Sequence, residues 1–195
     1  MKIGTHQLLD DLLKRTHQSS AAAQQFKALS TQELNFKSSP TSWSILECIE
    51  HLNLYGDFYL PEIEKQILKQ KQTSASSHFK SGFIGNYFAN LMLVKNGKVK
   101  KMQSPKDKNP INSALSSITI DRFLKQQEAL ESLLVQARKI DLVKTKAAIS
   151  LTKAITLRLG DTFRFFVYHI ERHIVQAQRV QANHLSKVAE EHPVL

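Results

Sequence analysis

Cysteine is nearly absent from this sequence, with Cys48 as the one example in 195 residues. A disulfide framework within the chain is therefore excluded, which fits a reducing compartment. Paired-cysteine metal motifs, glycine-rich phosphate loops and the serine-hydrolase elbow are absent as well. Cys48 itself lies within an apolar helical pattern, so we interpret it as a core residue rather than a ligand.

Long hydrophobic runs are also missing. The first ten residues contain no apolar stretch of signal-peptide length, and no window of the chain approaches a membrane-spanning segment. We therefore expect a soluble, cytoplasmic protein that does not use a membrane as a partner.

Acidic residues are few relative to basic ones, which gives a formal net charge of +10 at pH 7. Such a balance is compatible with nucleic acid, an anionic membrane or an acidic small molecule as partner. The most basic stretch runs from Lys95 to Lys108, but its lysines are not interleaved with aromatic residues. We interpret it as a solvated loop and do not expect nucleic-acid binding.

The apolar residues, 42% of the chain, recur mainly at helical spacing. They predict four long helices, at about 5–29, 44–71, 117–139 and 161–185. A single domain over 1–195 follows, of the all-α class, built as a four-helix bundle with a long connection or insertion at about 73–115 between the second and third helices.

Local signals refine the second and fourth helices. Ser44 and Glu47 have the spacing of a capping box at the start of the second helix. Pro61 then predicts either a kink or a turn that opens a new segment. Before the fourth helix we expect Gly160 to break the chain and Asp161 to serve as the cap.

Two other segments are less regular. Residues 82–94 have the pattern of a short buried helix, whereas residues 141–159 partly alternate, which is closer to strand or irregular structure. The insertion at 73–115 can be either an elaboration over the mouth of a site or an ordinary surface insertion.

A pair of histidines in the last helix is the main candidate site. His169 and His173 are four residues apart, which places both imidazoles on one face of a helix. With His51 from the second helix as a third ligand, they can hold a divalent metal and leave a coordination position open. Zinc, nickel and iron all accept imidazole. The alternative is a half-buried pair that is hydrogen-bonded to its surroundings.

Four further residues have both a functional and an ordinary interpretation. Glu47 can orient the ring of His51, although we prefer its capping role. Gln176 can reach a metal-bound water or be a surface residue. Arg164 and Arg172 can bind an anionic substrate or be solvated.

The order Trp43-Ser44, then Glu50-His51-Leu52, then His169-x-x-x-His173 with Gln176 resembles the DinB-like superfamily, from the first helix to about residue 180. That superfamily includes the DinB_2 group and the bacillithiol- and mycothiol-dependent transferases. The resemblance implies an up-down-down-up bundle with His51, His169 and His173 as the metal ligands. Zinc or nickel is the expected ion, with iron or manganese as alternatives.

The resemblance also implies an activity. We expect a metal-dependent enzyme that activates a low-molecular-weight thiol for transfer to an electrophile, with activation of water by a hydrolase as the alternative. A non-catalytic metal-binding or stress-response module is the third option, and a homodimer is an open alternative to a monomer. No catalytic residue or general base can be identified from the sequence.

Overall fold

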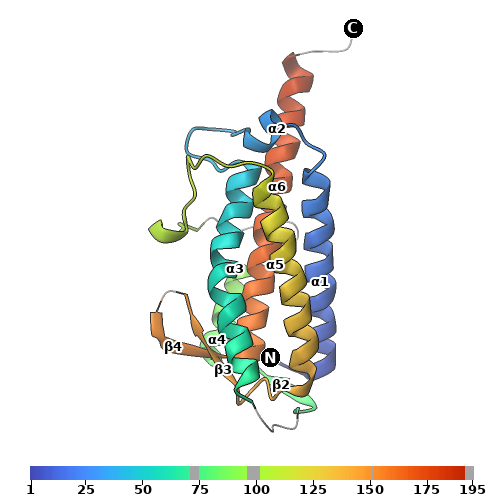
Figure 1. Cartoon of the computed structure of the whole chain (residues 1–195), viewed down its shortest axis with the longest axis vertical. Helices are drawn as coiled ribbons and strands as arrows, with labels where there is room; N and C mark the ends of the chain where they lie inside the picture. The colour runs from blue at the N-terminus through green and yellow to red at the C-terminus, as the bar shows by residue number, and fades with distance from the viewer. Residues whose placement is uncertain (71–74, 96–101, 151, 192–195) are drawn as a thin grey trace.

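Four long helices form a bundle in the computed structural model, which describes residues 1–70, 75–95, 102–150 and 152–191. They are α1 (Thr5–Phe26), α3 (Ile45–Leu68), α5 (Ile118–Gln136) and α6 (Leu159–Glu191). Their arrangement is shown in Figure 1. The expected all-α four-helix bundle is confirmed, although the last helix is longer at both ends than the sequence pattern predicts.

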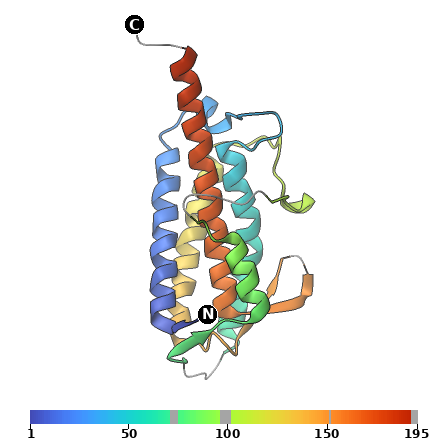
Figure 2. The same cartoon turned by 180° about the vertical axis from the view of Figure 1, so that it is seen from behind.

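Contacts between the helices define their directions. At one end of the bundle, the Lys27 ammonium pairs with the Asp121 carboxylate, which places the end of α1 beside the start of α5. Asn53 donates to the carbonyl of Thr119, and Gln126 donates to Asp57 further along, so α3 and α5 run the same way. Both therefore run against α1 and α6, which gives an up-down-down-up order that can be followed in Figures 1 and 2.

Shorter elements surround the bundle. Strand β1 pairs antiparallel with β2, which is distant in the chain, and β3 pairs antiparallel with β4; Ile3 lies opposite Phe79 and Ala147 opposite Leu157. The short elements are β1 (Lys2–Gly4), α2 (Thr31–Asn35), β2 (His78–Lys80), α4 (Phe83–Met92), η1 (Lys106–Lys108), η2 (Ala137–Lys139), β3 (Lys146–Ile149) and β4 (Thr152–Arg158). The expected insertion thus contains a strand, a helix and a helical turn, and residues 73–74 and 96–101 of it lie outside the described residues.

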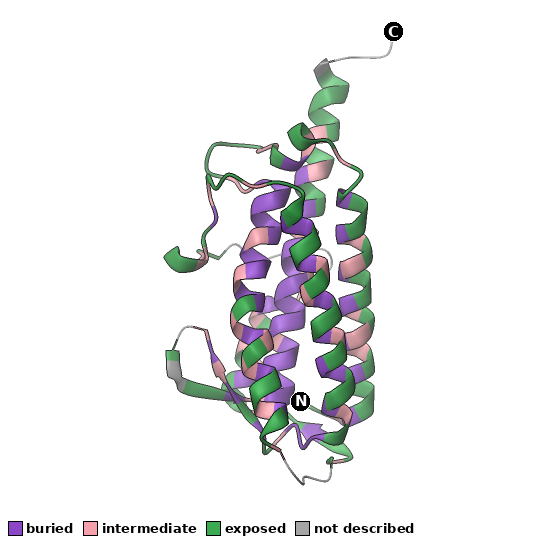
Figure 3. Cartoon of the chain, in the orientation of Figure 1, coloured by how far each residue is buried: buried purple, intermediate pink, exposed green. Residues whose placement is uncertain are grey.

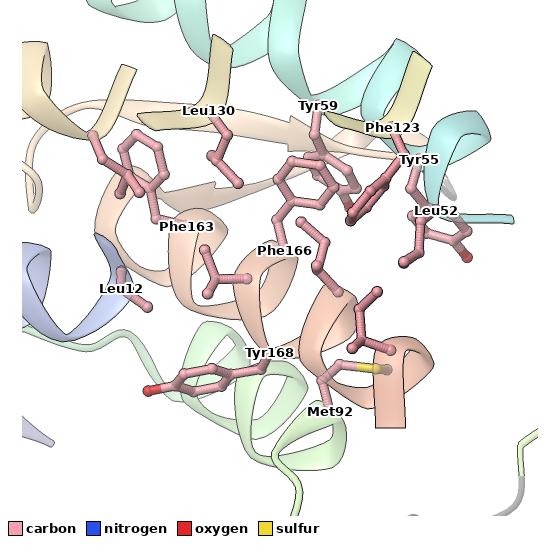
Figure 4. Close-up of a cluster of buried hydrophobic side chains, with 14 of the residues drawn as sticks. Leu12, Leu52, Tyr55, Tyr59, Met92, Phe123, Leu130, Phe163, Phe166 and Tyr168 are labelled. Carbon is pink, nitrogen blue, oxygen red and sulfur yellow. The ribbon is translucent and has the colours of Figure 1, made fainter. Parts of the chain in front are cut away.

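The inner faces of the helices form one hydrophobic core. Figure 3 shows the buried stripe on each long helix, and Figure 4 shows the aromatic centre of the core. Tyr59 of α3, Phe123 of α5 and Phe166 of α6 are all 1% exposed or less. Because helical spacing brings one face of each helix to the same side, these apolar stripes meet when the four helices pack.

Helix α3 begins with the expected capping box. The Ser44 hydroxyl accepts a hydrogen bond from the backbone N–H of Glu47 at 3.2 Å, and the Glu47 carboxylate accepts from the backbone N–H of Ser44 at 2.8 Å. The helix continues without a break through Pro61. Pro61 is exposed, so water can reach the carbonyl that loses its helical partner there.

The start of α6 differs from expectation. Gly160 does not break the chain but lies in the first turn of the helix. Its lack of a side chain makes room for the ring of Phe79, because an added Cβ would lie 2.5 Å from Phe79 Cε2. Asp161 does not cap α6: its carboxylate accepts from the backbone N–H of Gly82 at 2.7 Å and pairs with Arg164. It therefore ties the start of α6 to the start of α4.

None of the helices among the described residues is both long enough and apolar enough to cross a membrane.

Candidate metal centre

Three buried histidines meet between α3 and α6. His51, His169 and His173 are 2%, 4% and 8% exposed, and one ring nitrogen of each lies within 4.8 Å of the others. His169 and His173 are one turn apart on α6, and the antiparallel α3 brings His51 to the same level of the bundle. The structure thus brings together the three residues selected from the sequence.

The Nδ1 atoms of two of the three rings, which face away from the cluster, have hydrogen-bond acceptors. His51 Nδ1 lies 2.6 Å from the backbone carbonyl of Lys108, and His173 Nδ1 lies 2.9 Å from Gln176 Oε1. A carbonyl oxygen only accepts, so each Nδ1 carries the proton and each Nε2 is left with a free lone pair. Metal-binding histidines commonly donate in this way through the nitrogen that does not bind the ion.

The spacing of the ring nitrogens fits a shared ion. His51 Nε2 and His169 Nε2 are 3.2 Å apart. Two imidazole nitrogens bound tetrahedrally at about 2.0–2.1 Å from zinc would lie roughly 3.3–3.4 Å from each other. His169 Nδ1 is buried and has no hydrogen-bond partner among the described residues. Packing and the contact of its Nε2 with His51 therefore set the orientation of this ring. The donor set therefore suits a borderline divalent metal such as zinc or nickel.

The electrostatics of the pocket favour neutral imidazoles. Burial lowers the pKa of His51 to about 4 despite its bond to Lys108. Burial, followed by the neighbouring ionisable groups, holds the pKa values of His169 and His173 well below the ordinary value. The positive charge of Arg172 adds to this depression at all three rings. Neutral imidazole is the form that binds a metal ion.

Aromatic rings surround the three histidines. The centroid of Trp43 lies 4.7 Å from that of His51 and 5.7 Å from that of His173. Tyr55 lies against His169 at 4.4 Å, and Phe165 stacks parallel to the same ring at 5.9 Å. These contacts restrict ring rotation, which keeps the ligand nitrogens in place.

The histidines open onto a cavity of about 1,010 Å³. Its walls come from the segment before α3, from α3 and α6, from α4, from residues 102–111 and from the β3–β4 hairpin. Much of the expected insertion therefore forms a wall of the cavity. Beyond the histidines, the main lining residues are Ser38, Ser39, Thr41, Ser42, Trp43, Tyr55, Tyr59, Phe88, Leu91, Met92, Met102, Ser104, Lys106, Ile149, Leu157, Phe165, Arg172, Gln176, Arg179 and Asn183.

The other residues selected from the sequence fall in different places. Gln176 contacts the ring of His173, rather than serving as a surface residue. Arg172 lines the cavity, but Arg164 does not: it is 2% exposed and paired with Asp161 at 3.0 Å. Cys48 is completely buried in the core, where burial and then the charge of Glu47 raise the pKa of its thiol.

Glu47 has a function that the sequence pattern did not indicate. Besides its capping bonds, its Oε1 accepts from the Lys37 ammonium at 2.7 Å and from the backbone N–H of Asn112 at 2.5 Å. Asn112 has a φ of 64°, a left-handed conformation that asparagine tolerates better than most residues. Glu47 thus fastens the segment that carries the carbonyl of Lys108 to the start of α3.

Two other site features were missed. The Lys108 carbonyl is a backbone group, so its contact with His51 leaves no signal in the choice of residue. Arg179 lies two turns after Arg172 on the same helix face, and both line the cavity. This helical spacing was visible in the sequence, and it was the signal that could have identified Arg179.

The family model of the DinB superfamily matches residues 12–177, a span that includes all three histidines. No curated protein and no solved structure matches the chain. The match covers most of the chain, and the fold and the buried histidine cluster agree with it. The chain therefore belongs to the DinB superfamily.

Proposed function

We propose that this protein is a metal-dependent enzyme that activates a low-molecular-weight thiol for transfer to an electrophile. The observation that carries the proposal is the convergence of three neutral, buried imidazoles at the wall of a large cavity. Three protein ligands leave a coordination position for an exchangeable group, which is the usual arrangement of a catalytic rather than a structural site.

The residues of the chain would divide the work as follows. His51, His169 and His173 hold the ion, while the Lys108 carbonyl and Gln176 keep the rings of His51 and His173 in the ligating tautomer. The bound ion would supply Lewis-acid activation, lowering the pKa of a coordinated thiol so that its nucleophilic form exists near neutral pH. The aromatic rings around the site hold the imidazoles in position.

The composition of the cavity favours a thiol over water as the nucleophile. No aspartate or glutamate occurs among the described residues that line it. A hydrolase benefits from a general base, because even a metal-coordinated water must lose a proton during attack. A free thiol has a pKa of about 8.5, so metal coordination alone can bring it to the reactive form. Hydrolysis is thus the less well supported of the two proposed activities.

Metal analysis of the purified protein tests the site. We expect about one equivalent of divalent metal in the native chain and a large loss in His51→Ala and His173→Ala. His17→Ala is the matched control, since that histidine lies on α1 with a side chain that is 63% exposed. Full metal occupancy in both cavity variants would refute the three-histidine site.

Activity is tested separately by following the consumption of thiols in the presence of a generic electrophile, with and without added zinc or nickel. We expect metal-dependent consumption that is lost in His51→Ala and kept in His17→Ala. If a fully metal-loaded protein consumes no thiol from a chemically varied panel, the site is a binding module and the enzyme proposal fails.

A further inference from the structure

Helix α4 presents large apolar side chains to the solvent. Phe83, Ile84 and Tyr87 are 93%, 52% and 58% exposed, and their spacing places them on one side of the helix. The opposite side, which includes the buried Gly85 and Ala89, packs on α6, as the green helix of Figure 2 shows. The apolar side therefore faces away from the bundle. Neighbouring exposed apolar side chains of this size indicate an interaction surface.

Two lysines lie beside the first turn of α4. Strand β2 ends at Lys80, three residues before Phe83, and Lys80 lies directly opposite Lys2 in the pair formed by β1 and β2. Both are exposed, and neither ammonium pairs with a carboxylate among the described residues. Like charges that face each other across an antiparallel pair are destabilising, so the fold gains nothing from them by itself. An anionic partner would offset this repulsion.

Arg158 adds a third positive charge at the same place. Its guanidinium donates to the backbone carbonyl of Lys80 at 2.5 Å, which holds it beside the start of α4. The carboxylate of Asp161, which also contacts the start of α4, is completely buried and paired with Arg164. That carboxylate therefore leaves the charge of the surrounding surface uncompensated.

The excess positive charge of the whole chain is concentrated in the segment that contains α4. Of the 27 basic residues, nine are lysines between Glu64 and Asp107, where the sequence has no acidic residue. The other 18 basic residues are almost balanced by the 17 acidic residues of the chain. Nearly all of the net charge of +10 therefore comes from one stretch of sequence, and the exposed apolar side chains of α4 lie within it.

The docking surface is defined here by three cations and three exposed apolar side chains, Lys2, Lys80, Arg158, Phe83, Ile84 and Tyr87. We propose that it binds the surface of an anionic lipid bilayer. The cations lie at the headgroups, and the apolar side chains enter the boundary between headgroups and acyl chains. Membrane contact was not expected from the sequence, because no segment is suited to span a bilayer, but a protein that rests on the surface needs no span.

The combination of side chains favours a bilayer over two other occupants. A second copy of the chain in a two-fold contact would bring the same lysines of both copies together, and their repulsion would oppose the contact. Double-stranded nucleic acid would pair its phosphates with the cations but would offer little apolar surface to Phe83 and Ile84. An anionic bilayer offers both negative headgroups and an apolar layer directly beneath them.

Co-sedimentation of the full chain with vesicles tests the proposal. One set of vesicles contains phosphatidylcholine alone, and the other contains phosphatidylcholine mixed with the anionic phosphatidylglycerol. We expect the protein to bind the mixed vesicles, to bind the neutral ones far more weakly, and to be released at high salt, because salt screens exposed charges. Equal binding to both sets, or no binding to the mixed vesicles, would overturn the proposal.

An apolar substitution tests the contribution of α4. Phe83→Ser should weaken binding to the mixed vesicles about tenfold, because the phenyl ring no longer leaves water. Ile118→Ser is the matched control and should bind as the native chain does. Ile118 is 72% exposed at the start of α5, which lies beside the end of α1 and so at the other end of the bundle from β1. Equal binding by the two variants would mean that α4 does not enter the bilayer.

A charge substitution tests the lysines in the same way. Lys80→Gln should weaken binding about fivefold, since a cation near an anionic bilayer contributes about that factor. Lys125→Gln, which removes an exposed cation of α5, should have no such effect. All four substituted residues are exposed, so the fold should persist, and circular dichroism checks this. An equal loss in the two lysine variants would reduce the binding to a general effect of net charge and refute the docking surface.

The single cysteine allows the contact to be located. Cys48 is completely buried, so a thiol-reactive dye attaches at an introduced cysteine instead. With an environment-sensitive dye in Asn90→Cys, on the exposed side of α4, mixed vesicles should shift the emission to the blue, whereas Ser132→Cys on α5 should show no shift. A shift at Ser132→Cys alone would place the contact elsewhere. These measurements involve neither metal nor thiol, so their outcome is independent of the proposed function.

Discussion

At the scale of single residues, the site depends on hydrogen bonds that select one tautomer of two of its three imidazoles, those of His51 and His173. His51 donates to a backbone carbonyl and His173 donates to the Gln176 side chain, which leaves the opposite nitrogens free toward each other. The two supports differ in origin, because the carbonyl of Lys108 cannot be changed by substitution whereas Gln176 can. Gln176 therefore offers the most direct test of how the ring environment tunes metal affinity.

We expect Gln176→Ala to lower zinc affinity about 10- to 100-fold, because the His173 ring loses the acceptor that fixes its tautomer. Competition with a chromophoric chelator measures the change. Gln178→Ala is the control, since Gln178 lies on the exposed side of the same helix. Equal zinc affinities in the two variants would show that the bond from His173 to Gln176 has no effect on the ion.

At the scale of secondary-structure elements, two capping boxes within the described part of the chain have very different surroundings. Ser30 with Glu33 begins the exposed helix α2, and Ser44 with Glu47 begins the buried helix α3. Only Glu47 also accepts from Lys37 and Asn112, which secures the segment that contacts His51. The same local motif therefore has a purely local effect in one place and a long-range effect in the other.

Glu47→Ala should lower the free energy of unfolding by about 2–3 kcal/mol, because it removes the cap and leaves buried hydrogen-bond donors without an acceptor. Glu33→Ala should cause a clearly smaller loss. Urea denaturation of both variants measures the difference. We also expect weaker zinc binding in Glu47→Ala alone, and a similar stability in both variants would contradict the anchoring function of Glu47.

A buried ion pair within α6 also contacts the start of α4. Asp161 and Arg164 are 0% and 2% exposed, and the carboxylate also holds the backbone N–H of Gly82. Asp161→Asn should cost about 3–5 kcal/mol of stability, since it leaves the Arg164 charge buried without its counter-ion. Asp121→Asn, which breaks the exposed pair with Lys27, should cost less than about 1 kcal/mol. Thermal denaturation of the two variants compares the pairs, and equal losses would contradict this interpretation.

The long helices and the histidine cluster were accessible from the sequence for a common reason. Helical periodicity fixes which face of a segment is apolar, so His51 and His169 could be placed beside inward-facing stripes before their contact was known. The β3–β4 hairpin was harder, because residues 141–159 alternate only partially. The wall formed by residues 102–111 was predicted only as one of two alternatives for the insertion, since backbone groups and tertiary contacts such as Asn112 with Glu47 hold it in place.

At the scale of the whole molecule, a shared ion would connect two helices that are distant in the chain. His51 and His169 are 118 residues apart, yet their Nε2 atoms lie 3.2 Å from each other. An ion that binds only the folded bundle shifts the folding equilibrium toward the native state. The unfolded chain does not hold the three imidazoles together, so little of this binding energy is available to it.

Zinc should therefore raise the melting temperature. At a free concentration about a thousand times the Kd, binding adds about 4 kcal/mol, which for a chain of this size corresponds to roughly 8–16 °C. Differential scanning calorimetry at several zinc concentrations measures the shift. His17→Ala should respond as the native chain does, whereas His51→Ala should not, since one of the two helices no longer supplies a ligand. An equal shift in His51→Ala would mean that zinc stabilises the fold from somewhere other than the junction of α3 and α6.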